Sequence, residues 1–383
     1  MKILILTAAT GGGHIRAANA VQKYLQESTE LEVETVDTLK AVGRLLDKTV
    51  CDSYLFMARK APYLFGSLYK RTNQDTRFAQ LVPRLNALLS HALRHAVQSA
   101  DPDVIFSTHP FATQMVSSLK KSGDVDVPLI SLITDYGLHK AWIAPNVDSY
   151  IVACHDMVET LMEQGIPKER IHPFGIPVHG IFFRRDDKKE LRKKLLLDPE
   201  LSTVTFMAGS FGVSSIIDLY HDISSCTVPM QLIVITGKNQ KLYDAFTEEL
   251  SENSSIPTKL IYFTNEVENY MHASDLLVTK PGGLTVSEAL ASNLPLLVFN
   301  AIPGQEEDNA AFLSRHGMGI SVGKDDSIAP VITDLLQNPQ KFTEMQKNCR
   351  SFDKSDCMEN IAALCQSLAE KNAARERQLI RNG

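Results

Sequence analysis

The sequence KPGGLTVSEAL, at residues 280–290, decides how the rest of the chain is interpreted. It follows the apolar run DLLVT, residues 275–279, which predicts a buried strand, and residues 285–291 have the pattern of a helix. Gly282 and Gly283 therefore lie at a strand-to-helix junction, where backbone N–H groups and the positive end of the helix dipole can meet an anion. Glu288, one turn further, can accept hydrogen bonds from a sugar diol. The stretch indicates a nucleoside diphosphate site; the alternative is an ordinary turn followed by an exposed glutamate.

The composition predicts a soluble globular protein of two domains. The chain has 383 residues, of which 44% are apolar and 22% charged. The net charge of −6 argues against a nucleic-acid binder, and six cysteines without a CxxC pair indicate reduced thiols. Residues 1–7, MKILILT, predict a first strand rather than a signal peptide. No window approaches the roughly 20 apolar residues of a membrane span, so any membrane role is expected to be peripheral.

The first residues predict the opening of a parallel, doubly wound α/β domain. A strand at 3–8, a loop at 9–13, a helix at 14–26 and a strand at 33–36 follow one another. The loop TGGGH, residues 10–14, matches neither the dinucleotide nor the ATP-hydrolase glycine motif. His14 stands at the mouth of this turn, where such domains bind ligands; the alternative is a histidine that only bonds a neighbouring loop. A strand at 128–133 runs into TDYGLHKAW, residues 134–142, which brings Asp135 and His139 to the same edge.

Residues 54–95 interrupt this alternation with aromatic and basic side chains. Seven Lys and Arg residues against one Asp give the segment a net charge of +6. Such stretches bind anionic membrane surfaces, and each base contributes about 1 kcal/mol. The alternative is a helical hairpin with its aromatic side chains in the core. The residues expected at the membrane are Arg59, Lys60, Phe65, Tyr69, Lys70 and Arg71.

A second α/β unit follows a boundary marked by a Gly/Pro pair near residue 175 and a charged run at 184–194. Strands at 204–207, 231–235, 259–262, 275–279 and 296–299 each lead into a polar or glycine-bearing turn, and only helices are predicted after residue 305. Two such domains would face each other across a cleft. Since no group of residues has metal-ligand spacing, backbone N–H groups and a helix dipole are expected to meet the diphosphate charge. Two Asp-x-Asp strings, at 101–103 and 124–126, precede strands and are interpreted as solvated loops.

Three motifs together resemble a known family. TGGGH at 10–14, TDYGLHKAW at 134–142 and KPGGLTVSEAL with LPLLVFNAIPGQEEDN at 280–309 are similar to the glycosyltransferases that make galactosyl- and glucosyl-diacylglycerol. The chain most resembles the bacterial processive diacylglycerol β-glucosyltransferases, and more distantly plant monogalactosyldiacylglycerol synthase and the murein transferase that modifies lipid I. The resemblance covers nearly the whole chain. It implies a GT-B fold of two Rossmann-like α/β domains, a UDP-hexose donor, inversion at the anomeric carbon, no metal or other cofactor, and a peripheral position on the cytoplasmic face of the cell membrane. Some bacterial relatives depart from this chain at Gly12.

The implied domains are an acceptor- and membrane-binding domain, 1–180, and a UDP-sugar-binding domain, 181–359, with a C-terminal helix at about 360–383 packing back on the first. The implied reaction transfers a hexose from a UDP-sugar to the 3-hydroxyl of 1,2-diacylglycerol, and the hexose expected from the resemblance is glucose. Glycosyl-diacylglycerol would be a further acceptor in a processive enzyme, and an anionic membrane surface a further partner. A UDP-galactose donor and another lipid acceptor stay open as alternatives. The aromatic and basic segment argues against a UDP-sugar epimerase, and the presence of His14, Asp135 and Glu288 together argues against a non-enzymatic nucleotide-sugar sensor.

The resemblance also implies roles for single residues. His14 and Asp135 are both candidates for the base that takes the proton of the acceptor hydroxyl, and the sequence does not rank them. Glu288 is expected to bind the ribose hydroxyls of the UDP-sugar, and Phe263 is expected to lie beside its uracil ring. The residues expected on the donor side are Gly209, Ser210, Gly212, Phe263, Gly282, Gly283, Thr285, Glu288, Gln305, Glu306 and Asn309. Those expected on the acceptor side of the cleft are Gly12, Gly13, His139 and Trp142.

Overall fold

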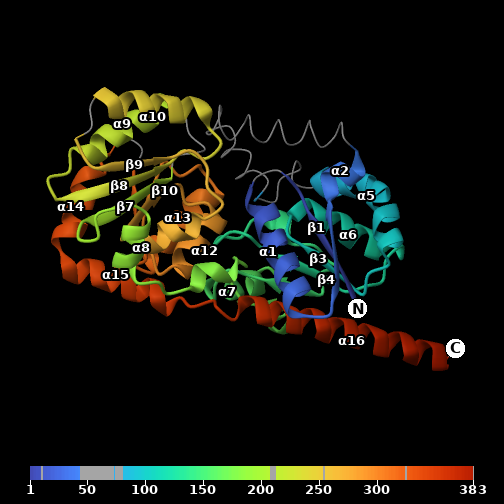
Figure 1. Cartoon of the computed structure of the whole chain (residues 1–383). Helices are drawn as coiled ribbons and strands as arrows, with labels where there is room; N and C mark the ends of the chain where they lie inside the picture. Colours follow the sequence, from blue (N-terminus) through green and yellow to red (C-terminus); the bar gives the residue numbers. More distant parts are fainter. Residues whose placement is uncertain are drawn as a thin grey trace.

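Two parallel sheets organise the protein (Figure 1). The structure, a computed structural model, describes residues 1–9, 12–43, 73, 81–207, 213–252, 255–323 and 326–382. Within these residues each sheet has six strands, in the orders β2-β1-β3-β4-β5-β6 and β12-β11-β10-β7-β8-β9. The crossover connections are helical, as parallel pairing requires, and helices cover the sheets (Figure 1).

The first sheet is built from short, almost wholly apolar runs. In β1 (Lys2–Thr7) every residue after the first is buried, because helices lie over both faces of a parallel sheet. The other strands are β2 (Glu32–Asp37), β3 (Val104–Ser107), β4 (Leu129–Leu132), β5 (Ser149–Ile151) and β6 (Ile171–His172). The helices are α1 (Gly12–Ser28), α2 (Thr38–Val42), α5 (Leu81–Ala100), α6 (Pro110–Ser122) and α7 (Asp156–Glu163), with short turns η1 (Lys140–Trp142), η2 (Lys168–Arg170) and η3 (Gly180–Phe183).

The second sheet repeats the scheme after α8 (Lys188–Lys194). Its strands are β7 (Ser202–Met207), β8 (Met230–Ile235), β9 (Thr258–Ile261), β10 (Leu276–Thr279), β11 (Leu296–Phe299) and β12 (Gly319–Val322). Its helices are α9 (Val213–Ser224), α10 (Gln240–Glu252), α11 (Val267–Ala273), α12 (Gly283–Ala291), α13 (Gln305–Arg315), α14 (Ala329–Gln337) and α15 (Pro339–Ser351).

The prediction that only helices follow residue 305 is wrong, because β12 forms the edge of the second sheet. Its sequence, GISV, contains a glycine and a serine and has no continuous apolar run. The strand is fixed by its pairing with β11 along four residues, a long-range contact that a short sequence window does not reveal.

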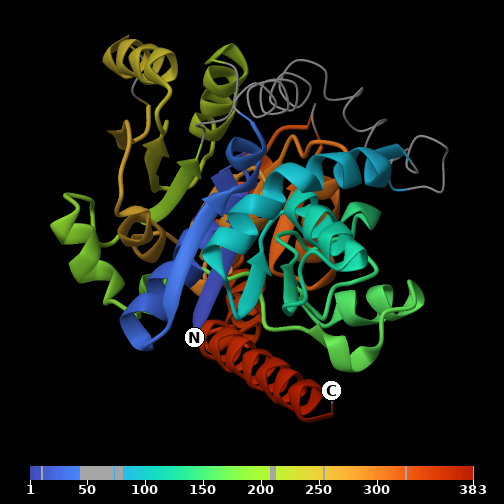
Figure 2. The same ribbon diagram turned by 90° about the vertical axis from the view of Figure 1, so that its right-hand side faces the viewer.

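The last helix, α16 (Cys357–Asn382), runs beneath the first domain (Figures 1 and 2). Cys357, Ile361 and Cys365 are buried in the same core cluster as Ile3 and Ile5 of β1. The chain thus leaves the second domain after α15 and closes against the first. The limits 1–180 and 181–359 remain predictions for the domains. In the part of the chain that the structure describes, no helix combines the length and apolar character needed to cross a bilayer.

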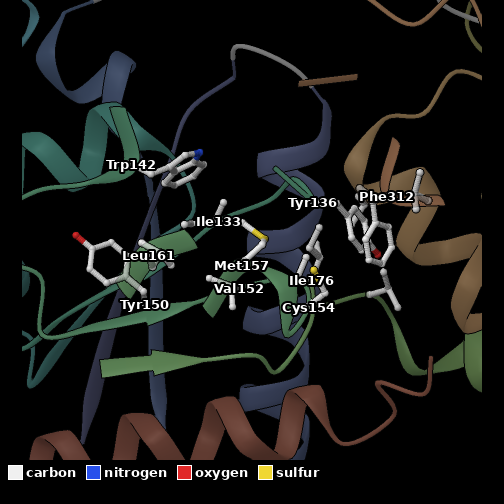
Figure 3. Packing of buried hydrophobic residues seen from close by; sticks show 14 of the residues in the cluster. Ile133, Tyr136, Trp142, Tyr150, Val152, Cys154, Met157, Leu161, Ile176 and Phe312 are labelled. Carbon is white, nitrogen blue, oxygen red and sulfur yellow. The ribbon is translucent and has the colours of Figure 1, made fainter. Parts of the chain in front are cut away.

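One of the core clusters spans both domains. A single cluster of buried apolar side chains includes Tyr136, from the segment after β4, and Phe312 of α13. Their rings stack with centroids 4.3 Å apart, and Figure 3 shows Tyr136 beside Phe312, at the far end of a row of first-domain side chains. The end of β4 is therefore held firmly against the second domain.

Candidate active site

His14 lies in the first turn of α1, where the glycine loop ends. Its Nδ1 is 2.8 Å from the carbonyl oxygen of Thr108 and 3.0 Å from Oγ1 of Thr134. Because a carbonyl oxygen only accepts hydrogen bonds, Nδ1 carries the proton, and Nε2 of the neutral ring keeps its lone pair. Burial lowers the pKa of His14 to about 4, against the hydrogen bond to Thr108. His14 is thus a neutral acceptor at physiological pH, and a weak base.

Two aromatic rings lie close to His14. The ring of His109, which follows β3, meets it edge-on at 4.6 Å, and the ring of Trp142 lies 6.1 Å away. His109 is buried, and its pKa is lowered by that burial and by His14. Trp142 is also buried, and Figure 3 shows it at the opposite end of the core from Tyr136. His139 accepts a hydrogen bond from the N–H of Ala141 at 3.1 Å and caps η1, so it shapes the turn that carries Trp142.

Asp135 follows β4 and faces the second domain. Its Oδ1 accepts a hydrogen bond of 3.1 Å from Nδ2 of Asn309 on α13. Burial raises the pKa of Asp135 to about 7, opposed by that hydrogen bond and reinforced by Glu306 and Asp308. A carboxyl group that titrates near neutral pH is a stronger proton acceptor than an imidazole with a pKa of about 4. The two candidate bases, which the sequence did not rank, therefore differ in pKa.

The glycine pair before α12 meets the first domain. Gly282 is the N-cap of α12, with no side-chain cap, and a Cβ atom there would have nothing within 4 Å. A Cβ atom on Gly283 would lie 2.1 Å from the carbonyl oxygen of Thr134 and 3.0 Å from Oδ1 of Asp135. The absence of a side chain at residue 283 therefore allows the two domains to come together. The sequence had predicted a different role for this glycine, the close approach of an anion. The start of α12 and Asp135 are neighbours.

Glu288 points from α12 toward the first domain. It is buried, and its Oε1 lies 3.3 Å from Nη1 of Arg16 on α1. Burial raises the pKa of Glu288 to about 7, and Arg16 opposes that rise. Arg16 was not a candidate from the sequence, although it stands two residues after His14. The carboxylate predicted for the ribose thus has a cationic partner from the opposite domain.

The start of α13 holds the other donor-side candidates. Oε2 of Glu306 accepts a hydrogen bond of 2.8 Å from the N–H of Ile302 and lies 4.0 Å from Nζ of Lys280; burial raises its pKa. Asn309 is fully buried and bonded to atoms of both domains. Gln305 is the first residue of this helix and Thr285 lies in the first turn of α12, both partly exposed.

Phe263 follows β9 and is 46% exposed, so its ring is available to a ligand. Nζ of Lys238, in the turn after β8, lies 4.7 Å from the centroid of that ring. The sequence did not single out Lys238. On the first domain, Gly12 and Gly13 begin α1, and a Cβ atom on Gly13 would just reach Leu284 of α12, at 4.0 Å.

Two sets of predicted residues lie outside the described residues. They are the loop residues Gly209, Ser210 and Gly212, and the membrane candidates Arg59, Lys60, Phe65, Tyr69, Lys70 and Arg71. Among the residues that are described, no group of three or more His, Cys, Asp or Glu side chains could hold a metal ion.

Sequence comparison places the two halves in known families. The family model of monogalactosyldiacylglycerol (MGDG) synthase matches residues 14–178, and that of the glycosyltransferase family 28 C-terminal domain matches residues 203–361. A processive diacylglycerol β-glucosyltransferase of Staphylococcus carnosus is 31% identical over 358 residues, which cover 92% of this chain and 88% of the relative. The chain belongs to the family of processive diacylglycerol β-glucosyltransferases.

Solved structures show the same fold. MurG of Acinetobacter baumannii superposes with a TM-score of 0.65 at 16% identity, covering 96% of this chain and all of MurG. HepE of Anabaena, in complex with UDP, gives a TM-score of 0.58 at 16% identity over 96% of this chain and all of HepE. The predicted family, the GT-B fold and the class of hexosyltransferase are confirmed.

Proposed function

We propose that this hexosyltransferase moves glucose from UDP-glucose to the 3-hydroxyl of 1,2-diacylglycerol. The observation that carries the proposal is the meeting of Asp135 with the start of α12. A Cβ atom on Gly283 would lie 3.0 Å from Oδ1 of Asp135, so a base and a helix N-terminus suited to a diphosphate come from opposite domains to one place. The names of the relatives support the lipid acceptor, and HepE, solved with UDP, supports the nucleotide.

Asp135 acts as the base in the proposed reaction. With a pKa of about 7, roughly half of its carboxyl groups are ionised at neutral pH, and the ionised form takes the proton of the acceptor hydroxyl. The hydroxyl oxygen attacks C1 of the hexose while the bond from C1 to the UDP oxygen breaks, and direct displacement inverts the anomeric carbon. UDP leaves toward the first turn of α12, where the helix dipole stabilises its charge.

His14 orients the acceptor. The Thr108 carbonyl holds the proton on Nδ1, so Nε2 can accept a hydrogen bond from the attacking hydroxyl. A pKa of about 4 keeps the ring neutral and makes proton removal by His14 the slower route. Glu288 binds the ribose hydroxyls with Arg16 beside it, and the exposed face of Phe263 receives the uracil ring.

The protein works at a membrane in this proposal, as a peripheral protein on the cytoplasmic face. The basic and aromatic residues of segment 54–95 dock on anionic lipid and keep the glycolipid product at the surface. Retention of the product would let it return as acceptor and receive a second sugar.

In the test, purified protein is incubated with liposomes that contain or lack diacylglycerol, together with UDP-glucose or UDP-galactose. The lipid products are followed by thin-layer chromatography. We expect a glycolipid that needs both diacylglycerol and UDP-glucose. Product formed only from UDP-galactose would favour the galactosyltransferase alternative, and product independent of diacylglycerol would favour another lipid acceptor. If neither donor yields a glycolipid, the proposal is wrong.

A further inference from the structure

Asn309 joins the candidate base to the donor turn. This side chain lies on α13, is fully buried, and uses its amide on three partners. Its Oδ1 accepts from the N–H of Tyr136 at 2.7 Å, and its Nδ2 donates to Oδ1 of Asp135 at 3.1 Å and to the carbonyl oxygen of Pro281 at 2.9 Å. Both N–H donors are therefore committed to protein, one to each domain, which leaves none for the donor sugar.

The contact around this amide is tight. A Cβ atom on Gly137 would lie 2.4 Å from Cβ of Asp308, next to Asn309 on α13. The hydroxyl of Tyr136 lies 2.9 Å from Oγ of Ser287 on α12. The segment after β4 thus enters the space between α12 and α13 in one register, and Asp135 follows the position of α13.

We propose that Asn309 is a positioning residue: it holds the Asp135 carboxylate beside the start of α12 when the two domains are in contact, so that one side chain assembles base and donor turn together. The inference rests on the proposed function, in which Asp135 is the base. An amide N–H that donates to a carboxylate favours its ionised form, and a buried carboxyl group depends on such donors. Loss of the bond would leave Asp135 both misplaced and harder to ionise.

The charges around Asp135 set the direction of the effect. Glu306 and Asp308, on α13, already raise its pKa, and the Asn309 hydrogen bond lowers it. Nζ of Lys280 lies 4.0 Å from Oε2 of Glu306, one of those two acids. His14, which bonds Oγ1 of Thr134 beside Asp135, is neutral above about pH 4. Removing the amide therefore raises the pKa of Asp135, and the pH below which turnover falls moves upward.

The experiment compares pH profiles of kcat for the full-length protein, with diacylglycerol liposomes and UDP-glucose. Asn309→Ala should move the acidic limb upward by about one pH unit and lower kcat at pH 7 about tenfold, with a smaller change in KM, as expected for a lost hydrogen bond to a charged group. Asn309→Asp keeps the shape of the side chain and adds a second carboxylate, so its acidic limb should move at least as far.

Ser287→Ala is the matched control, because it removes a hydrogen bond across the same domain contact without touching Asp135. Its acidic limb should coincide with that of the wild type. Equal losses of stability and kcat in Asn309→Ala and Ser287→Ala, with both limbs unmoved, would overturn the inference while leaving the proposed function intact. An inactive wild type, in contrast, would remove the proposed function itself and the inference with it.

Discussion

Gly283→Ala tests whether the two domains must meet closely for turnover. The added Cβ atom would lie 2.1 Å from the carbonyl oxygen of Thr134, whereas such contacts need at least 3.0 Å. The start of α12 and the end of β4 would have to separate by about 1 Å, and both belong to buried parallel sheets that yield little. The backbone angles are not the obstacle, because Gly283 is already helical.

The expected cost follows from that displacement. Overpacking of a filled site costs about 1–3 kcal/mol, and a shift of about 1 Å between reacting groups lowers turnover about 100-fold. We therefore expect Gly283→Ala to lower kcat/KM about 100-fold and the free energy of unfolding by about 1–3 kcal/mol. Gly282→Ala is the comparison, because its Cβ atom would meet nothing within 4 Å. That variant should lose about 1 kcal/mol of helix capping and less than tenfold in rate.

The assay is the initial rate of glycolipid formation over a range of UDP-glucose concentrations, with urea unfolding of the same preparations. Retention of kcat/KM within about threefold of wild type by Gly283→Ala would refute the argument, since 1 Å is already enough to misplace reacting groups. Equal losses in both glycine variants would also count against it, because only one of them meets the first domain.

Further predictions concern pH, packing and the membrane. The pKa of Asp135 is about 7 in the folded protein against an ordinary 3.8, so between these pH values the folded state binds a proton that the unfolded state has lost. The free energy of unfolding therefore falls as the pH rises from about 4 to 7. Asp135→Asn should flatten that part of the plot of unfolding free energy, measured in urea, against pH, and an unchanged slope would contradict the burial argument. Phe312→Ala should lower the free energy of unfolding by about 3–5 kcal/mol, measured in urea, because the ring is fully buried and stacks on the other domain; a loss below about 1 kcal/mol would mean the shared core is weak. Replacing Lys60, Lys70 and Arg71 by alanine should weaken binding to anionic vesicles more than 100-fold, and high salt should also weaken it. Vesicle co-sedimentation that changes neither with the substitutions nor with salt would exclude electrostatic docking.

Much of the fold was predictable because local patterns and burial agree. Apolar runs such as residues 2–7 and 276–279 become buried strands, and the polar turns after them lie at the carboxyl ends of the sheets. The two Asp-x-Asp strings do precede β3 and β4, and Asp103 and Asp124 bond Lys2 and Arg94 there. The strand β12 escaped prediction because its place depends on pairing with β11 rather than on its own composition.

The candidate site was predictable in its residue types and less so in its contacts. His14 and Asp135 stand out in the sequence because they follow predicted strands, and Glu288 because it lies one turn into the helix after the glycine pair. Their partners do not, because Arg16 meets Glu288 across 272 residues of sequence and Asn309 meets Asp135 across 174. A pKa shift depends on those partners and on burial, so the difference in pKa between the two candidate bases could not be predicted from the sequence.

The most direct test of the account is the mass spectrum of lipid extracted after purified protein has been incubated with UDP-glucose and diacylglycerol liposomes. The account predicts a lipid heavier than diacylglycerol by one hexose residue, followed in time by species carrying two or more, with one UDP released for each hexose transferred. It predicts at least a 100-fold slower appearance of these species with Asp135→Asn, as expected for loss of a general base. A spectrum with diacylglycerol unchanged, or equal product from wild type and Asp135→Asn, would contradict it.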